Sequence, residues 1–165
     1  MSTELVAYFS ATGRTAKVAK QLAQALHSEI YEIKPEVKYN KSDLNWMNSK
    51  SRSSLEMNSK SFRPRIITGD IDVAGFDTIY LGFPIWWYVA PTVINSFLES
   101  YDFSGKKILL FATSGSSGFG STLSELKPSA PTAEFFEIKV LSGILLDSKT
   151  VNLISEIADI NNNRR

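Results

Sequence analysis

Cysteine is absent from this chain of 165 residues, and histidine occurs once, as His27. Without cysteine there is no disulfide, no thiolate nucleophile and no cysteine-ligated metal. A single histidine rules out a cluster of histidine ligands, and its place near the end of a predicted helix favours a simple role opposite the helix dipole. The sequence therefore excludes most metal centres and all cysteine hydrolases.

Excess charge of either sign is lacking as well. Eighteen lysine and arginine residues stand against 17 aspartate and glutamate residues, which gives a formal net charge of +1. Because nucleic acids and anionic membranes are bound by concentrated positive charge, this balance favours neither as a partner. Long apolar runs and a signal-peptide pattern are also missing, so we expect no membrane span and a soluble, cytoplasmic protein.

Short apolar runs suited to buried parallel strands alternate with segments of helical periodicity. The predicted strands are 5–9, 29–34, 78–83, 106–113 and 135–146, and the predicted helices are 14–26, one beginning at Pro91, 122–127 and 149–160. This alternation predicts an α/β fold, an open five-stranded parallel sheet with helices on both faces. The length suits one substantial core, so we expect residues 1–165 to form a single domain.

Residues 36–65 interrupt the alternation. They are rich in Ser, Asn and Lys and have few apolar anchors, among them Trp46. Such a composition predicts a long connection that holds a loosely packed helix. Two roles stay open: the segment covers a ligand through Trp46, or it packs beside the site as structure only. We favour the second.

The loop behind the first predicted strand is suited to an anion. It is the hexapeptide Ser10-Ala11-Thr12-Gly13-Arg14-Thr15. Hydroxyl groups, a glycine and an arginine meet there at the start of a helix, whose free N–H groups and dipole favour phosphate. The spacing fits neither a P-loop nor the G-x-G-x-x-G fingerprint. The alternative is an ordinary helix start with Thr12 as its N-cap.

Two further loops leave the ends of predicted strands. One is Pro84-Ile85-Trp86-Trp87-Tyr88-Val89-Ala90-Pro91, and the other is Thr113-Ser114-Gly115-Ser116-Ser117-Gly118-Phe119-Gly120. The first supplies an aromatic wall, and the second supplies bare N–H groups and hydroxyls. Each has a structural alternative, because tryptophans can plug the end of a sheet and a Gly-Ser loop can be a plain tight connection.

Ligands of open parallel sheets bind at the carboxyl ends of the strands, so the three loops should meet. A phosphate cradle, an aromatic wall and a polar rim fit a flat, partly apolar ligand with one phosphate, which describes flavin mononucleotide (FMN). No metal and no catalytic side chain is implied. The predicted cofactor-binding residues are Ser10, Ala11, Thr12, Gly13, Arg14, Thr15, Pro84, Ile85, Trp86, Trp87, Thr113, Ser114, Gly115, Ser116 and Gly118.

These motifs resemble those of a known family. The chain resembles a flavodoxin, and specifically the small bacterial flavodoxin-like proteins with a Ser/Thr-x-Thr-Gly-x-Thr loop, a Gly-x-Pro-Ile-Trp-Trp segment and a Thr-Ser-Gly-rich loop. The likeness includes Tyr101–Lys106 and leaves out residues 36–65. It implies a strand order of 2-1-3-4-5, with the FMN phosphate on the first loop and the isoalloxazine ring between the other two.

Single residues argue against other proteins of this fold class. Phe83 and Pro84 stand where a receiver domain needs an acidic phosphoacceptor. The first loop has no cysteine, which a low-molecular-weight tyrosine phosphatase requires. Residues 115–118 lack the G-x-S-x-G spacing of an esterase.

The resemblance implies an electron carrier whose redox partner is a reductase or an acceptor protein. Well-known carriers are strongly acidic and have a glycine beside the flavin, whereas this chain is nearly neutral and residues 84–91 contain no glycine. We therefore expect weak electrostatic steering of redox partners and a leaning to two-electron chemistry.

Phe119 is the one aromatic residue in residues 113–120. An uncovered ring face would admit a nicotinamide or a small quinone, so the alternative is an NAD(P)H-dependent FMN quinone or flavin reductase. A flavin-binding module without redox duty is the third hypothesis, and we expect a monomer or a weak dimer.

Overall fold

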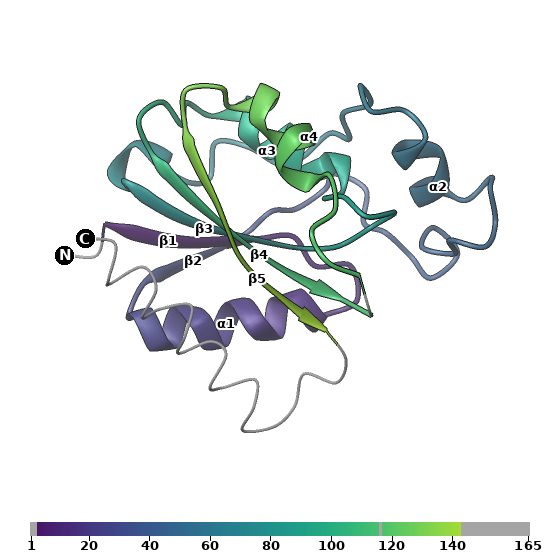
Figure 1. Cartoon of the computed structure of the whole chain (residues 1–165), viewed down its shortest axis with the longest axis horizontal. Helices are drawn as coiled ribbons and strands as arrows, with labels where there is room; N and C mark the ends of the chain where they lie inside the picture. The colour runs from purple at the N-terminus through teal and green to yellow at the C-terminus, as the bar shows by residue number, and fades with distance from the viewer. Residues whose placement is uncertain (1–2, 116, 143–165) are drawn as a thin grey trace.

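The computed structural model of the chain describes residues 3–115 and 117–142. Five parallel strands form one sheet in the order β2-β1-β3-β4-β5, with α1 on one face and α3 and α4 on the other (Figure 1). The elements are β1 Glu4–Tyr8, α1 Arg14–Leu26, β2 Glu29–Glu32, α2 Arg52–Met57, β3 Thr78–Pro84, α3 Thr92–Ser100, β4 Lys107–Ser114, α4 Thr122–Leu126 and β5 Glu134–Ser142. The predicted fold class and strand order are confirmed.

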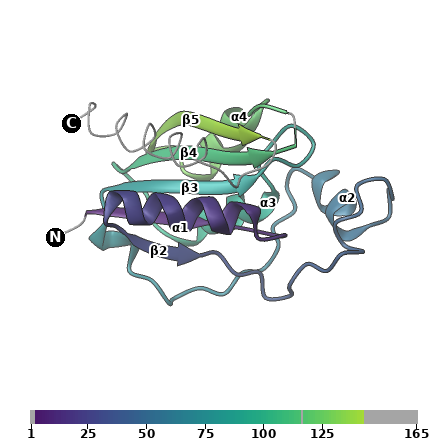
Figure 2. The same ribbon diagram turned by 90° about the horizontal axis from the view of Figure 1, so that it is seen from below.

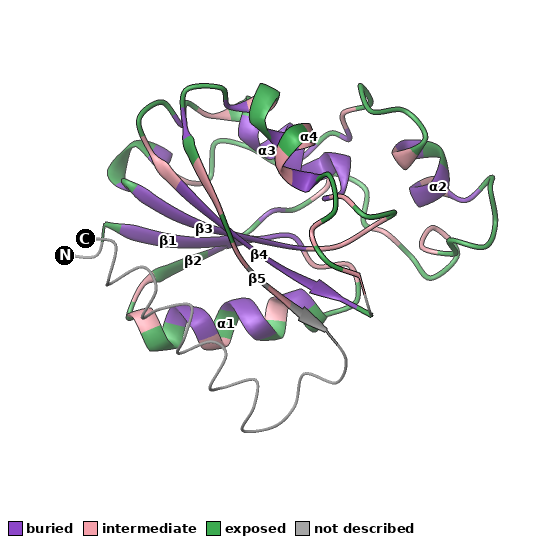
Figure 3. Cartoon of the chain, viewed as in Figure 1, coloured by how far each residue is buried: buried purple, intermediate pink, exposed green. Residues whose placement is uncertain are grey.

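The sheet is buried on both faces, as its continuous apolar strands require. Figure 2 shows α1 lying along the sheet, and its Val18 and Leu22 pack against Tyr80 of β3. The opposite face carries the larger cluster, in which Phe97 of α3 meets Leu81 and other strand residues. In Figure 3 the central strands β1, β3 and β4 are buried along most of their length. This rigid sheet presents its carboxyl ends as one edge.

Gly82 of β3 makes room for a large side chain on the neighbouring strand. Gly82 pairs in register with Phe111 of β4. A Cβ atom on Gly82 would lie 2.2 Å from the Phe111 ring. Since real side chains do not approach so closely, this glycine is what allows Phe111 to lie fully buried beneath α1.

Element boundaries differ from the predictions in small ways. Pro91 is the N-cap of α3 and lies just outside the helix. The helix α4 ends at Leu126, one residue before the predicted end, and a 3₁₀ turn over Lys127–Ser129 follows, which accepts Pro128 near its start, where no N–H bond is lost. The predicted helix 149–160 and the end of the predicted strand 135–146 lie outside the described residues.

Residues 36–65 extend from the sheet beyond the carboxyl ends of the strands (Figure 1). They contain α2, but the packing is polar: Ser53, Ser54 and Glu56 are buried, whereas Trp46 is 71% exposed. The prediction of a helix within a long connection is confirmed, and the role of Trp46 stays a prediction. Across the described ranges, no helix is both long and apolar enough to cross a membrane.

Candidate functional site

The first loop leaves the start of α1 without a side-chain cap. The N-cap is Gly13, at φ 96°, and no side chain in the described part of the chain accepts a hydrogen bond from the first helical turn. Thr12 is exposed and does not cap, which removes the simplest structural explanation of this residue. Instead the Gly13 N–H donates to Ser10 Oγ at 3.0 Å. The open helix start therefore still offers its N–H groups and dipole to an anion.

The first and third loops are joined by a buried pair of hydroxyls. Thr15 Oγ1 and Thr113 Oγ1 lie 2.8 Å apart, and both residues are buried. The Thr15 hydroxyl is thus engaged with the protein, while its backbone belongs to the open helix start. This bond holds the start of α1 against the end of β4.

The second loop is attached to the same threonine. The Ile85 N–H donates to the Thr113 carbonyl at 2.9 Å. Pro84 is the last residue of β3 and pairs with Thr113 of β4, and Ile85 follows it. Both residues are half-buried. Thr113 therefore bonds to both other loops, which brings all three predicted loops to one edge.

The third loop is closed by its own hydroxyls beyond that threonine. Ser114 Oγ accepts from the Ser117 N–H at 2.8 Å, and the two hydroxyls also lie 2.8 Å apart. Gly115 and Gly118 are exposed. Ser116, which the sequence also predicts as a site residue, lies outside the described residues. The loop thus presents exposed backbone beside the end of β4.

The second loop ends in a tight turn with two aromatic residues in the left-handed region. Trp86 and Val89 exchange backbone hydrogen bonds of 2.9 and 3.1 Å. Between them Trp87 has φ 49° and Tyr88 has φ 65°. Positive φ at both central positions is the pattern of a type I′ turn, which normally uses glycine or asparagine. Two bulky residues there carry strain, and such strain clusters at ligand sites.

The turn is held from the side of α4. The Ser121 N–H donates to the Tyr88 carbonyl at 3.1 Å. A side chain on Gly120 would lie 2.1 Å from that same carbonyl oxygen, so the contact requires glycine. This hydrogen bond attaches the turn to the start of α4.

The two tryptophans have different environments, which the sequence could not distinguish. Trp86 is half-buried and packs edge-to-face on Phe9 and Tyr39, with ring centroids 5.7 and 5.4 Å away. Trp87 is 43% exposed. Trp86 thus packs against the protein and anchors the loop, which is the structural role that the sequence analysis left open for the tryptophans. Trp87 remains available to a ligand.

Sequence reasoning missed the group of residues behind Trp86. The Tyr39 hydroxyl donates to Glu56 Oε1 at 2.5 Å, and the Arg52 guanidinium lies 3.8 Å from the centre of the Tyr39 ring. Arg52 Nε also donates to Glu56 Oε2 at 2.9 Å. Burial, and then the bond to Glu56, raise the pKa of the Tyr39 hydroxyl. The one signal in the sequence was the i,i+4 spacing of Arg52 and Glu56.

Comparison with known proteins agrees with this geometry. The flavodoxin family model matches residues 3–157. The chain belongs to the flavodoxin family. No curated protein matches at a significant level.

Solved flavoprotein structures are similar to this flavodoxin over most of its length. One from Bacteroides uniformis is 45% identical, with a TM-score of 0.83, and the match covers 91% of this chain and 95% of that chain. One from Bacteroides eggerthii is 37% identical, with a TM-score of 0.82 and coverage of 96% and 99%. A Lactobacillus acidophilus flavoprotein in complex with FMN is 23% identical, with a TM-score of 0.64 and coverage of 86% and 93%, and shows the fold alone.

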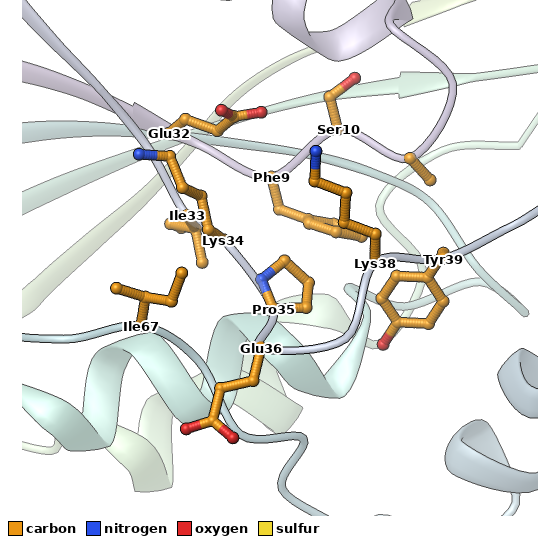
Figure 4. A pocket seen from close by; sticks show the side chains of 11 residues that line it. Phe9, Ser10, Glu32, Ile33, Lys34, Pro35, Glu36, Lys38, Tyr39 and Ile67 are labelled. Carbon is orange, nitrogen blue, oxygen red and sulfur yellow. The ribbon is translucent and has the colours of Figure 1, made fainter.

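A cavity of about 330 Å³ lies beside the first loop of this flavodoxin, on the side of β2 (Figure 4). Phe9, Ile33 and Pro35 form apolar parts of its lining, and Ser10 belongs to both the cavity and the loop. Lys34 and Lys38 line it together with Glu32 and Glu36, and none of the four forms an ion pair with any described residue. The cavity therefore carries charges of both signs beside the first loop.

The described residues of this flavodoxin suit an organic phosphate cofactor better than a metal. Within residues 3–115 and 117–142, no group of three or more His, Asp or Glu side chains is arranged to hold a metal ion. The uncapped start of α1, by contrast, offers free N–H groups to an anion, and exposed backbone of the third loop lies beside it. The donor set fits FMN.

Proposed function

We propose that this flavodoxin binds FMN at the three loops and carries electrons between protein partners. The observation that carries the proposal is the uncapped start of α1, tied through Thr113 to both other loops. Family membership supports it, and so does the FMN complex of the Lactobacillus acidophilus relative. FMN supplies the redox chemistry when bound, and the protein supplies binding, orientation and electrostatics.

The proposed roles follow the position of each loop. Backbone N–H groups of residues 12–15, with Arg14 beside them, hold the phosphate, whose charge the helix dipole also favours. Pro84 to Trp87 lie along one side of the ring. The exposed backbone of residues 114–118 offers donors to the polar edge of the ring, where negative charge accumulates on reduction.

A protein partner is favoured by the surface beside these loops. Tyr88 is 70% exposed and Trp87 43% exposed, at the tip of the turn that borders the flavin position. Exposed aromatic side chains are enriched where proteins dock. A partner that contacts this turn would come close to the ring, which is what electron transfer between proteins requires.

A second function has one observation in its favour. The cavity beside Ser10 is lined by Lys34 and Lys38 and by the carboxylates of Glu32 and Glu36, all without ion-pair partners among the described residues. The lysines would contact the phosphates of NAD(P)H and the carboxylates would accept hydrogen bonds from its ribose hydroxyls, and the protein would then be a reductase of quinones or flavins. Electron transfer from NAD(P)H would then need no separate reductase.

The first experiment is a visible absorbance spectrum of the purified protein, taken after addition of excess FMN and removal of the unbound part. We expect a retained flavin spectrum, and a colourless protein would overturn FMN binding. Steady-state oxidation of NAD(P)H with a quinone then separates the two functions. Turnover only in the presence of a separate flavodoxin reductase supports the carrier. Rapid turnover without it, reduced in a Lys34→Ala, Lys38→Ala variant, supports the reductase.

A further inference from the structure

Three aromatic rings from separate segments form a triangle of contacts behind the second loop. Phe9 follows β1, Tyr39 belongs to the 36–65 connection, and Trp86 begins the turn over residues 86–89, the aromatic turn. The ring centroids lie 5.4 to 5.7 Å apart, and each pair of rings meets at a steep angle, 65° to 87°. Because edge-to-face contacts are directional, each ring restricts the other two. The position of Trp86 thus depends on a residue outside the three loops.

The Tyr39 ring is held in place by α2. Its hydroxyl donates to Glu56 Oε1 at 2.5 Å, and the Arg52 guanidinium lies over its face, 3.8 Å from the ring centre. Arg52 Nη1 also donates to the carbonyls of Val37 and Lys38, at 2.8 and 3.2 Å, just before Tyr39 in the chain. Two residues one helical turn apart therefore fix the hydroxyl, the ring face and the preceding backbone.

The polar bonds around Tyr39 specify a position more than they add stability. The Glu56 side chain is 7% exposed, and its carboxylate accepts from both Tyr39 and Arg52. Removing a carboxylate from water is costly, and an ion pair of good geometry offsets this cost without a large surplus. A displaced Tyr39, however, would leave the buried carboxylate without one of its donors. The network therefore favours one position of the ring.

Trp86 transmits this position to the flavin loops. Its backbone exchanges two hydrogen bonds with Val89 and so closes the aromatic turn, whose exposed tip borders the proposed ring position. Phe9 directly precedes Ser10 of the first loop. In Figure 4, Phe9 and Tyr39 lie side by side at the wall of the cavity beside Ser10. Tyr39 thus contacts the residue that begins the turn on the ring side of the site.

We propose that Tyr39 is a positioning residue of the flavin site, which holds Trp86 and hence the aromatic turn at the place that the isoalloxazine ring requires. The proposal rests on FMN binding at the three loops. It gives the 36–65 connection a role other than the two that the sequence left open, since the connection acts on the site through Tyr39 and needs no contact with the ligand. The phosphate side is held separately, by the bond between Thr15 and Thr113.

The first test uses the apoprotein. In a Trp46→Phe, Trp87→Phe background, Trp86 is the sole tryptophan of the chain, so the fluorescence reports its packing alone. Tyr39→Phe keeps the ring and removes the bond to Glu56. We expect Trp86 to emit at a longer wavelength and to be quenched more easily by acrylamide. Glu56→Gln keeps an oxygen that accepts from Tyr39 and should change both properties less. Unchanged emission and quenching in Tyr39→Phe would overturn the proposal.

Tyr31→Phe in the same background is the matched control. Tyr31 also donates to a carboxylate, Asp70 Oδ1 at 2.6 Å, but its ring stacks on Phe97 of α3. The control loses a comparable hydrogen bond, so a general loosening of the fold would appear in it as well. We expect its Trp86 fluorescence to match that of the background protein. A change as large as in Tyr39→Phe would show a structural effect only and would contradict the positioning role.

The second test uses the FMN-loaded full chain with its three tryptophans. The visible circular dichroism of bound FMN reports how the protein surrounds the ring, and we expect Tyr39→Phe to change it while Tyr31→Phe does not. Riboflavin lacks the phosphate, so its binding measures the ring side alone. Affinities for FMN and riboflavin should both fall in Tyr39→Phe by the same factor, up to about tenfold. A fall for FMN alone would place the effect at the phosphate and refute the proposal.

Failure of this inference and failure of the proposed function remain distinct. A protein that retains FMN, with the same circular dichroism in Tyr39→Phe, keeps the proposed function and loses only the positioning role. A protein that stays colourless after addition of FMN loses the proposed function, even where Trp86 fluorescence responds to Tyr39→Phe as expected.

Discussion

Thr12 illustrates how a single side chain can serve a ligand and not the fold. It is exposed at the start of α1, and the N-cap position belongs to Gly13. We predict that Thr12→Ala weakens FMN binding by about 1 to 3 kcal/mol, because a hydrogen bond to a charged phosphate is lost. The stability of the apoprotein should stay the same. Isothermal titration with FMN and urea unfolding of the apoprotein measure the two effects.

The control for Thr12 lies at the other end of the sheet. Thr3 is also exposed, and it directly precedes β1. Thr3→Ala should bind FMN like the unmodified protein. Equal FMN affinity in the Thr12 and Thr3 variants would remove Thr12 from the proposed site.

Tyr88 tests whether the aromatic turn is strained. Its φ of 65° suits glycine, while its exposed ring has little packing to lose. Alanine and glycine both remove the ring, but only glycine accepts this φ without a steric cost. We predict that Tyr88→Gly is more stable than Tyr88→Ala by about 1 kcal/mol in urea unfolding of the apoprotein. An alanine variant as stable as the glycine variant would show that the turn is relaxed.

At the scale of elements, the 36–65 connection is held to the sheet by Tyr39. Its ring packs on Phe9 and Trp86, and its hydroxyl is bonded to buried Glu56. Burial and that bond raise the pKa of the hydroxyl, so the folded state holds this proton more tightly than the unfolded chain does. The resulting stability is complete below the unfolded pKa of about 10 and is lost as pH rises above it.

The corresponding prediction concerns alkaline pH. Between about pH 9 and pH 11, around the ordinary tyrosine pKa, the free energy of unfolding should fall more steeply in the unmodified protein than in Tyr39→Phe. Urea unfolding across this range measures both slopes. Tyr31, whose pKa is also raised by burial and by its bond to Asp70, remains in both proteins and cancels in the comparison. Parallel slopes would mean that Tyr39 ionises in the folded protein as it does in the unfolded chain.

The elements show where sequence patterns are informative. The apolar run of β4 and the periodicity of α1 predicted their elements to within about a residue, because burial on the sheet requires these patterns. The α-helix α4 ends at Leu126, one residue before the predicted end, because Pro128 disfavours a helix interior but is accepted in the first turn of the 3₁₀ segment that follows. Local propensity therefore places this boundary to within about a residue.

For the whole molecule, the nearly balanced charge predicts weak long-range attraction. The net charge is +1 over 165 residues. Strong steering needs a large field of one sign, which salt screens as the Debye length falls from about 30 Å at 0.01 M to about 8 Å at 0.15 M. We predict that ferricyanide oxidises the reduced holoprotein at a rate that changes little over this range in stopped-flow measurements. A steep dependence on salt would reveal a local charged patch that the net charge conceals.

The candidate site was predictable as three loops but not as a set of contacts. Each loop shows its character in its own residues, and the parallel sheet brings strand ends to one edge. The bonds of Thr113 to Thr15 and Ile85 join residues far apart in the sequence, so no local pattern announces them. The different environments of Trp86 and Trp87 were also not predictable, because the two residues are neighbours in one motif.

The sequence by itself determined the fold class, the strand order implied by its family resemblance, and the chemistry of the loops, because apolar patterning and glycine and hydroxyl content act locally. The tertiary structure decided which hydroxyl and N–H groups have hydrogen-bond partners within the protein. It buried the Thr15 hydroxyl against Thr113, left the start of α1 uncapped, and enclosed the Thr92 hydroxyl without a partner among the described residues. Whether a polar group is satisfied depends on atoms from distant segments, and only the folded chain brings those atoms within hydrogen-bonding distance.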